Sequence, residues 1–214
     1  MPDPQYIPAL RFAAFTPLFD AFIGLVSPEE EFKRRLVGQA GITERARVLD
    51  LGCGTGTLAL LVKQAHPGAE VTGLDGDGEI LELARKKIER VGLGIKLDEA
   101  LADAMPYPDA SFDRVLSSLV FHHLPAPVKA AALKESFRVL KPGGELHIAD
   151  LGKPDTTLMK LISLLLWHFE ENADNYRGRL TGMCGEAGFT ENRITWRCST
   201  AFGTLNLYRA VKPL

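Results

Sequence analysis

The sequence has little cysteine and no charge excess of either sign. Its three cysteines, Cys53, Cys184 and Cys198, form no CxxC pair. This argues against a disulfide framework or a cysteine-rich zinc site and fits a reducing compartment. The 25 basic and 27 acidic residues give a net charge of −2, so we expect no nucleic-acid partner that needs a large basic surface. These features predict a cytoplasmic protein, and nothing in the sequence requires a metal.

Long apolar runs are also missing. The apolar stretch over residues 6–26 is interrupted by two prolines, an arginine and an aspartate, and the run at 158–169 has only twelve residues. A spanning helix needs roughly 20. The first residues also lack the basic region and apolar core of a signal peptide. We therefore expect neither a transmembrane segment nor a signal peptide.

The composition is that of a folded α/β protein. The chain has 214 residues, of which 46% are hydrophobic and 24% charged, enough for a core that needs no covalent cross-links. A helix is expected to start at Ser27-Pro28 and to end near Gly41. From Ala46 onward, strands and helices alternate, which predicts a parallel sheet with helices on both faces. Strands are expected at 47–51, 70–75, 94–101, 112–118, 145–150, 192–198 and 204–211. Helices are expected at 57–65, 78–91, from Pro127, at 155–172 and at 175–187.

One helix has a clear predicted start and a clear apolar stripe. Asp77 can cap the helix at 78–91. Helical periodicity predicts that its buried side chains are Ile80, Leu83, Ala84, Ile88 and Val91.

The segment between the first strand and its helix contains three alternate glycines, Gly52, Gly54 and Gly56. Glycine there allows a sharp turn and lets a ligand approach main-chain N–H groups. The dinucleotide-binding motif is GxGxxG, but here the third glycine is Gly56, one residue before the position that the motif requires. Asp50, at the strand end, suits a nucleoside that carries an ammonium group better than a pyrophosphate. A tight turn without a ligand is the remaining alternative.

Two further carboxylates follow the next two strands. Asp75 ends the second strand and can accept both hydroxyls of a ribose. Its alternative role is a helix cap, for which Asp77 is better placed. Asp103 follows the third strand beside Ala104 and Met105. It can meet an adenine amino group, or it is a solvated loop residue.

Four successive segments resemble the motifs of class I S-adenosylmethionine-dependent methyltransferases, in the group with the ubiquinone/menaquinone C-methyltransferases. They are VLDLGCGTGTLAL, GLDGDGEILELARKK, ADAMPYPDASFDRVLSSLVFHHL and ESFRVLKPGGELHIAD. The resemblance implies a doubly wound, Rossmann-like α/β fold with an N-terminal helical cap. The implied sheet has seven strands in the order 3-2-1-4-5-7-6, strand seven being antiparallel. The edge hairpin expected from the last two strands agrees with this.

The resemblance also implies which residues bind the cofactor, S-adenosylmethionine. The glycine turn would hold its methionine part, the second strand end its ribose, the Asp103 loop its adenine, and the fourth strand end its amino-acid group. The implied residues are Asp50, Gly52, Cys53, Gly54, Gly56, Asp75, Gly76, Asp103, Ala104, Ser117 and Ser118. Cys53 is interpreted as a small residue that fits inside the turn.

Methyl transfer needs alignment of the reacting atoms, and a base only if the acceptor must lose a proton. His122 and His123 follow the fourth strand and are the candidates, His123 being slightly preferred. The alternative is that both only start a helix. His147 alternates within a strand and is interpreted as structural.

The resemblance divides the chain into an N-terminal helical segment or lid, 1–45, and a cofactor-binding domain, 46–214, in a single structural domain. The resemblance also implies that residues 151–175 form a lid or specificity insertion. The helix expected over 158–169 is apolar on nearly all sides. We therefore expect a small, apolar acceptor, prenylated or aromatic. Simple burial, a homodimer contact and contact with a membrane surface stay open as alternatives.

Two other functions compete with methyl transfer. Tyr208 and Lys212 match the YxxxK pair of short-chain NAD(P)-dependent oxidoreductases, but on the last strand and not on a helix. A protein that binds S-adenosylmethionine without catalysis would also have the glycine turn and the three carboxylates.

Overall fold

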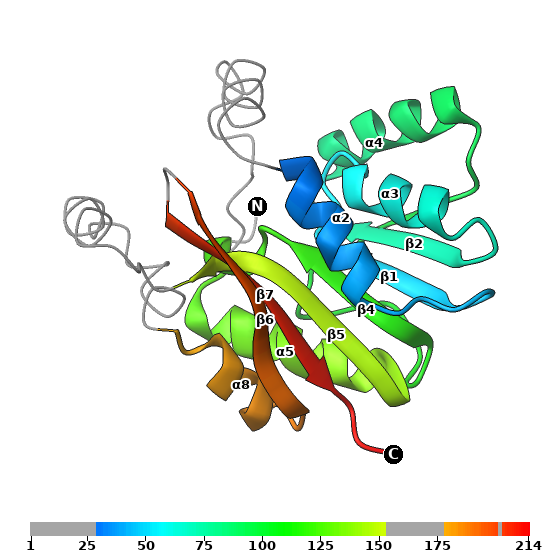
Figure 1. Ribbon diagram of the computed structural model, residues 1–214. Coiled ribbons are helices and arrows are strands. Elements are labelled where there is room, and N and C mark those ends of the chain that lie inside the picture. The colour runs from blue at the N-terminus through cyan, green and yellow to red at the C-terminus, as the bar shows by residue number, and fades with distance from the viewer. Residues whose placement is uncertain (1–28, 153–177, 201–202) are drawn as a thin grey trace, which may run out of the picture.

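The computed structural model describes residues 29–152, 178–200 and 203–214 (Figure 1). The expected helix start at Ser27-Pro28, residues 1–28 of the N-terminal segment or lid expected over 1–45, and the apolar helix at 158–169 lie outside these residues. Most of the proposed insertion at 151–175 lies outside them too.

The centre of the molecule is a seven-stranded sheet in the order β3-β2-β1-β4-β5-β7-β6. Neighbouring strands pair in parallel from β3 to β5, whereas β7 pairs antiparallel with both β5 and β6. The fold class and strand order implied by the sequence are therefore confirmed. The strands are β1 (Arg47–Leu51), β2 (Glu70–Asp75), β3 (Lys96–Glu99), β4 (Phe112–Ser118), β5 (Leu140–Gly152), β6 (Thr190–Thr200) and β7 (Gly203–Val211).

Helices cover both faces of this sheet (Figure 1). One face carries α2 (Glu29–Gln39), α3 (Thr57–Ala65) and α4 (Gly78–Val91), and the other carries α5 (Ala126–Val139) and α8 (Leu180–Glu186). The short 3-10 helix η1 (Phe121–His123) joins β4 to α5. The architecture follows from strands that alternate with amphipathic helices.

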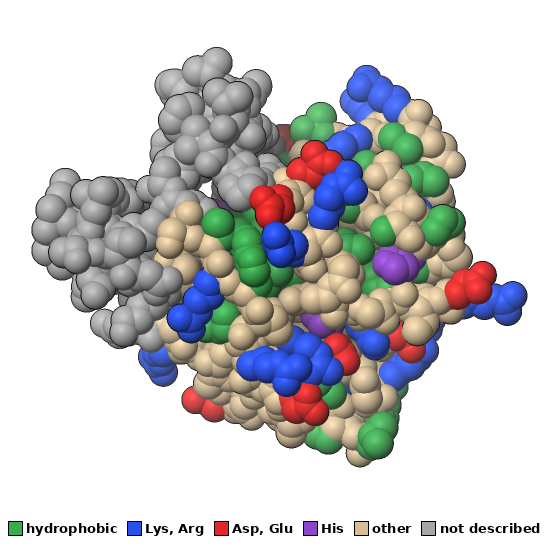
Figure 2. Space-filling view, viewed as in Figure 1, with side chains coloured by type: hydrophobic (Ala, Val, Ile, Leu, Met, Phe, Trp, Pro, Cys, Tyr) green, Lys and Arg blue, Asp and Glu red, His purple; other side chains and the backbone are tan. Residues whose placement is uncertain are grey.

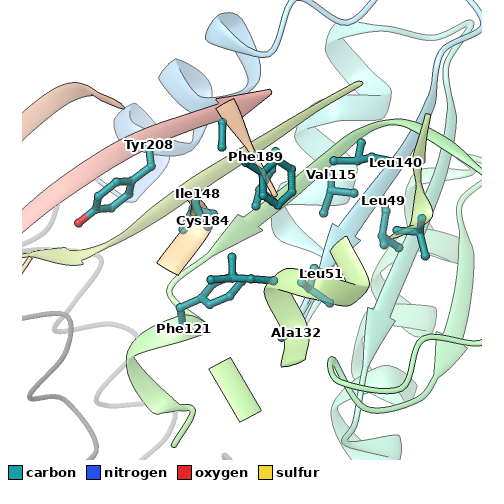
Figure 3. Close-up of a cluster of buried hydrophobic side chains, with 14 of the residues drawn as sticks. Leu49, Leu51, Val115, Phe121, Ala132, Leu140, Ile148, Cys184, Phe189 and Tyr208 are labelled. Carbon is teal, nitrogen blue, oxygen red and sulfur yellow. The ribbon is translucent and has the colours of Figure 1, made fainter. Parts of the chain in front are cut away.

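Each face of the sheet has its own apolar core. The core under α5 and α8 includes Leu51, Val115, Phe121 and Ile148, all at most 1% exposed (Figure 3). The core under α2 and α3 is built around side chains such as Leu36, which is fully buried. The central strands are thus covered on both sides, which explains why four consecutive residues of β1, from Val48 to Leu51, are all buried.

The stripe predicted for α4 is partly wrong. The buried residues are Leu81, Ala84 and Ile88, whereas Leu83 is 51% and Val91 48% exposed. The helix therefore presents the face defined by the i, i+3, i+7 spacing of its three buried residues. The predicted cap is confirmed: the Asp77 carboxylate accepts hydrogen bonds from Glu79 N and Ile80 N.

Within the described ranges, no helix combines the length and the apolarity needed for a membrane span. Figure 2 shows basic and acidic side chains scattered over one face of the molecule, with hydrophobic side chains exposed between them.

The order of the strands reverses at β1: β2 and β3 are added on one side of it, and β4 and β5 on the other. In sheets of this kind, ligands bind at the carboxyl ends of the strands beside such a switch point. The turn after β1 and the ends of β2, β4 and β5 meet there.

Candidate functional site

The turn between β1 and α3 has a backbone that only glycine adopts without strain. Gly52, Gly54 and Gly56 have φ of 69°, 52° and 74°, in the left-handed region. A Cβ on Gly52 would lie 2.3 Å from Val120 Cγ2, whereas one on Gly54 would meet no atom of the described chain within 4 Å. The first glycine is therefore needed for packing, and the second leaves open space beside the main chain.

Cys53 lies inside this turn and faces the sheet. Its side chain is buried, and a Cβ added to Gly73 would come within 2.9 Å of Cys53 Sγ. Burial raises the pKa of the Cys53 thiol, and the charges of Asp50 and Asp75 raise it further. Since the thiolate is the nucleophilic form, this cysteine is an inert packing residue.

Asp75 ties the end of β2 to the glycine turn. Its Oδ2 accepts a hydrogen bond from Gly54 N at 2.8 Å, and its Oδ1 accepts one from Asp77 N at 3.1 Å. Burial raises the pKa of Asp75, while these N–H donors act to lower it. The carboxylate thus sits beside the open space at Gly54, held by two main-chain groups.

Asp50, expected to bind the cofactor, is enclosed by the protein. It is 1% exposed, and its Oδ2 accepts a hydrogen bond from Ala59 N at 2.9 Å in the first turn of α3. Burial raises its pKa to about 7, although the positive charge of Lys33 on α2 acts to lower it. Asp50 therefore helps to position the glycine turn from inside the protein, because it holds the first turn of α3.

The loop after β3 carries the remaining predicted carboxylate. Asp103 is half-buried, Ala104 is exposed and Met105 is buried. Met105 N donates a hydrogen bond to Glu135 Oε2 at 2.9 Å, which anchors the loop to α5.

The two serines at the end of β4 have different surroundings. Ser117 is fully buried, and its hydroxyl donates to Leu51 O at 2.9 Å, joining β4 to β1. Ser118 Oγ is buried, and no hydrogen-bond partner for it is found in the described part of the chain. Of these two serines, Ser118 is therefore the one whose hydroxyl is available to bind a ligand.

A histidine–carboxylate pair closes the other side of the site. His122 Nδ1 lies 2.8 Å from Asp150 Oδ1, and His122 N donates to Asp150 Oδ2 at 3.3 Å. Leu151 N also donates to Asp150 Oδ1, at 2.7 Å. Asp150 is fully buried at the carboxyl-terminal part of β5. Sequence reasoning missed this residue, and its only signal was its place near the end of a strand.

His123 stacks on His122, with ring centroids 3.9 Å apart. The pKa of His123 is lowered to about 4, first by desolvation and then by the neighbouring imidazole of His122. Near neutral pH, His123 is therefore a much weaker base than an ordinary histidine. The preference for His123 over His122 has no support in this arrangement.

The alternative acid pair of an oxidoreductase is not assembled. The Tyr208 hydroxyl accepts a hydrogen bond from Asn206 Nδ2 at 3.0 Å. Lys212 Nζ instead donates to Phe137 O at 2.8 Å and to Leu140 O at 2.7 Å. Among the residues that the structure describes, no three His, Cys, Asp or Glu side chains converge on a metal position.

Comparison with known proteins agrees with this geometry. Residues 48–144 match the model of a family described as a methyltransferase domain. A demethylmenaquinone methyltransferase of Thermus thermophilus is 39% identical over 145 residues, which cover 67% of this chain and 65% of that protein. A ubiquinone/menaquinone biosynthesis C-methyltransferase of Xanthomonas campestris is 36% identical over 183 residues, or 74% of this chain and 71% of that one. The chain thus spans about two thirds of the length of these relatives.

Solved structures share the fold. The YcgJ protein of Bacillus subtilis superposes with a TM-score of 0.70 at 18% identity, covering 86% of this chain and 99% of that one. A methyltransferase of Methanosarcina mazei, described as SAM-dependent, gives a TM-score of 0.69 at 23% identity, with 84% and 97% coverage. The chain belongs to the class I S-adenosylmethionine-dependent methyltransferases, in the group that contains the ubiquinone/menaquinone biosynthesis C-methyltransferases.

Proposed function

We propose that the chain transfers a methyl group from S-adenosylmethionine to a small acceptor. The observation that carries the proposal is the Asp75 carboxylate bound to Gly54 N beside a turn of three left-handed glycines. When bound, S-adenosylmethionine supplies a methyl carbon activated by a positively charged sulfur. The protein's part is to bind, to orient and to exclude water.

The residues present fit this cofactor. Gly54 leaves room for a ligand against the main chain, and Ser118 has a buried hydroxyl for which the described chain offers no partner. Asp75 would hold the ribose hydroxyls, with Gly76 beside it. Asp103 and Ala104 would border the adenine, and Ser118 would bind the amino-acid group. The glycine turn would be shaped by residues that do not themselves contact the cofactor, namely Gly52, Cys53, Gly56 and Ser117.

Asp50 would act by charge on the ammonium group. Its pKa near 7 means that the ligand-free protein holds it partly protonated at neutral pH. A nearby cation favours the ionised form. Cofactor binding would therefore release a proton from Asp50 and tighten as the pH rises through 7.

His122 would be the base that takes a proton from the acceptor. A buried carboxylate that accepts from Nδ1–H fixes the tautomer and leaves the lone pair on Nε2. Asp150 would thus be a positioning residue: it orients the ring and stabilises the imidazolium that forms. His123, with its lowered pKa, would border the acceptor.

The acceptor would be an aromatic ring bearing hydroxyl groups, such as a reduced quinone. Support comes from the names of the relatives, which act on demethylmenaquinone or in ubiquinone and menaquinone biosynthesis. Deprotonation of a ring hydroxyl activates the carbon beside it toward methylation. A cytoplasmic location, with access to lipophilic acceptors from a membrane surface, and a homodimer belong to the same proposal.

Calorimetric titration of the full chain with S-adenosylmethionine, S-adenosylhomocysteine and NADH tests the cofactor. We expect micromolar binding of the first two, none of NADH, and at least tenfold weaker binding by Asp75→Ala. Asp113→Ala is the matched control, because Asp113 lies at the start of β4, at the opposite end of the sheet. Binding of NADH alone, or of none of the three, would overturn the proposal. Failure to methylate any acceptor in a panel of phenols and quinols would instead favour a non-catalytic binding protein.

A further inference from the structure

A second polar group lies on the far side of Asp150 from His122. Asp150 on β5 and Asn206 on β7 are direct partners in the antiparallel register. Side chains of such partners lie on the same face of the sheet, with Cβ atoms about 5 Å apart. Asn206 and Tyr208 are each 4% exposed. The carboxylate of Asp150 is therefore flanked by the imidazole on one side and by these β7 side chains on the other.

The Asn206 amide is only half satisfied. Its Nδ2 donates to the Tyr208 hydroxyl at 3.0 Å, whereas its Oδ1 is buried without a hydrogen-bond partner in the described chain. Buried polar atoms in native proteins are nearly always paired, so an exception indicates a missing partner. The missing partner is a hydrogen-bond donor.

Tyr208 adds the complementary group. Burial raises the pKa of Tyr208 to about 12, and the charge of Asp150 contributes to the rise, so the hydroxyl stays protonated. The oxygen already accepts from Asn206, which leaves its own proton to donate. In Figure 3 the Tyr208 ring lies at the margin of the apolar cluster and its hydroxyl points away from it.

Glycine at position 152 makes this arrangement possible. A Cβ there would lie 1.9 Å from Asn206 Nδ2 and 3.2 Å from the Tyr208 hydroxyl. Any side chain at position 152 would therefore displace the amide. Gly152, Asn206 and Tyr208 form a group shaped around one acceptor atom and one donor proton.

We propose that Asn206 and Tyr208 bind a second hydroxyl group of the methyl acceptor, one that does not lose its proton to His122. A hydroxyl can donate to Asn206 Oδ1 and accept from Tyr208, so it matches both groups. The inference rests on the proposed function, because it assigns the acceptor's second contact in the same site. It makes Asn206 the residue that selects a dihydroxylated ring over a monohydroxylated one.

The test compares 1,4-dihydroxynaphthalene with 1-naphthol, kept anaerobic, on the full chain with S-adenosylhomocysteine present. Equilibrium titration should show the diol binding roughly ten- to a hundredfold more tightly, because the mono-ol leaves the amide unpaired. In Asn206→Leu the two affinities should agree within about threefold. Tyr208→Phe should reduce the ratio without abolishing it.

Asn192→Leu is the matched control. Asn192 Oδ1 is also buried without a partner in the described residues, but it lies near the start of β6, at the opposite end of the sheet. This variant should keep the wild-type ratio, and thermal melting checks that each variant folds. Equal affinities in the wild type, no binding of either compound, or an unchanged ratio in Asn206→Leu would overturn the inference. Selective diol binding without transfer of labelled methyl would refute the proposed reaction and leave the hydroxyl subsite standing.

Discussion

Replacing Asp50 by asparagine should make the ligand-free protein more stable at alkaline pH. The substitution keeps an oxygen that can accept from Ala59 N and removes a negative charge that the wild type holds in a fully buried place. The pKa of Asp50 rises from 3.8 in the free side chain to about 7 in the folded protein. Folding therefore opposes its ionisation.

The size of the effect follows from the shift. Each pKa unit is worth about 1.36 kcal/mol, so the folded wild type loses about 4 kcal/mol of stability relative to Asp50→Asn as Asp50 ionises. Well below pH 4, Asp50 is protonated in both the folded and the unfolded wild type, so this loss of stability is absent. It grows as the pH rises to 7 and then stays constant. The contributions of the other titrating groups to the free energy of unfolding cancel when the two proteins are compared.

Urea unfolding of both proteins at pH 4, 5.5, 7 and 8.5, followed by circular dichroism, measures the difference. The control is Asp113→Asn. Burial acts to raise the pKa of Asp113, but hydrogen bonds from Lys141 and Arg47 N outweigh it and lower the pKa, so this variant should lose stability at neutral pH. A stability difference for Asp50→Asn that does not change between pH 4 and 8.5 would refute the reasoning.

Three further predictions concern the turn, the cap and the base. Gly52→Ala should cost about 3 kcal/mol, from left-handed strain and the clash with Val120, and Val120→Ala in the same chain should restore part of it in urea unfolding. Asp77→Ala should cost about 1 kcal/mol in the same measurement, because α4 loses its cap; an unchanged midpoint would contradict this. Initial rates of methyl transfer should fall about 10²- to 10⁴-fold in His122→Ala and less than tenfold in His123→Ala, and the reverse order would transfer the base to His123.

Most elements in the first half of the fold were predictable because glycine, proline or a capping aspartate lies next to at least one of their ends. The limits of β1, α3, β2, α4 and β4 agree with the sequence prediction. The fifth strand begins at Leu140, whereas the sequence predicted its start at Glu145. The prediction was wrong because the segment KPGG has the composition of a turn. Its pairing with β4 across a register shift continues the strand through that segment.

The candidate site was predictable only in part. Asp75 and the glycines are recognised locally, because a strand, a turn and a helix follow one another there. The His122–Asp150 pair joins residues 28 positions apart, and the contact depends on how the strands align. The enclosure of Asp50 likewise depends on α3 and on Lys33 of α2. Contacts of this kind come from tertiary packing, which no local pattern contains.

The order of the strands has a consequence for engineering. The residues assigned to the cofactor come from β1, β2, the end of β4 and the loops that follow β1, β2 and β3. In contrast, Asp150, Gly152, Asn206 and Tyr208 come from β5 and β7. Under the proposed function, combinatorial libraries confined to β5 and β7 would change the residues around the acceptor and leave those assigned to the cofactor unchanged. Within such libraries, position 152 would set the accessible repertoire, since any residue larger than glycine forces a new side chain at 206.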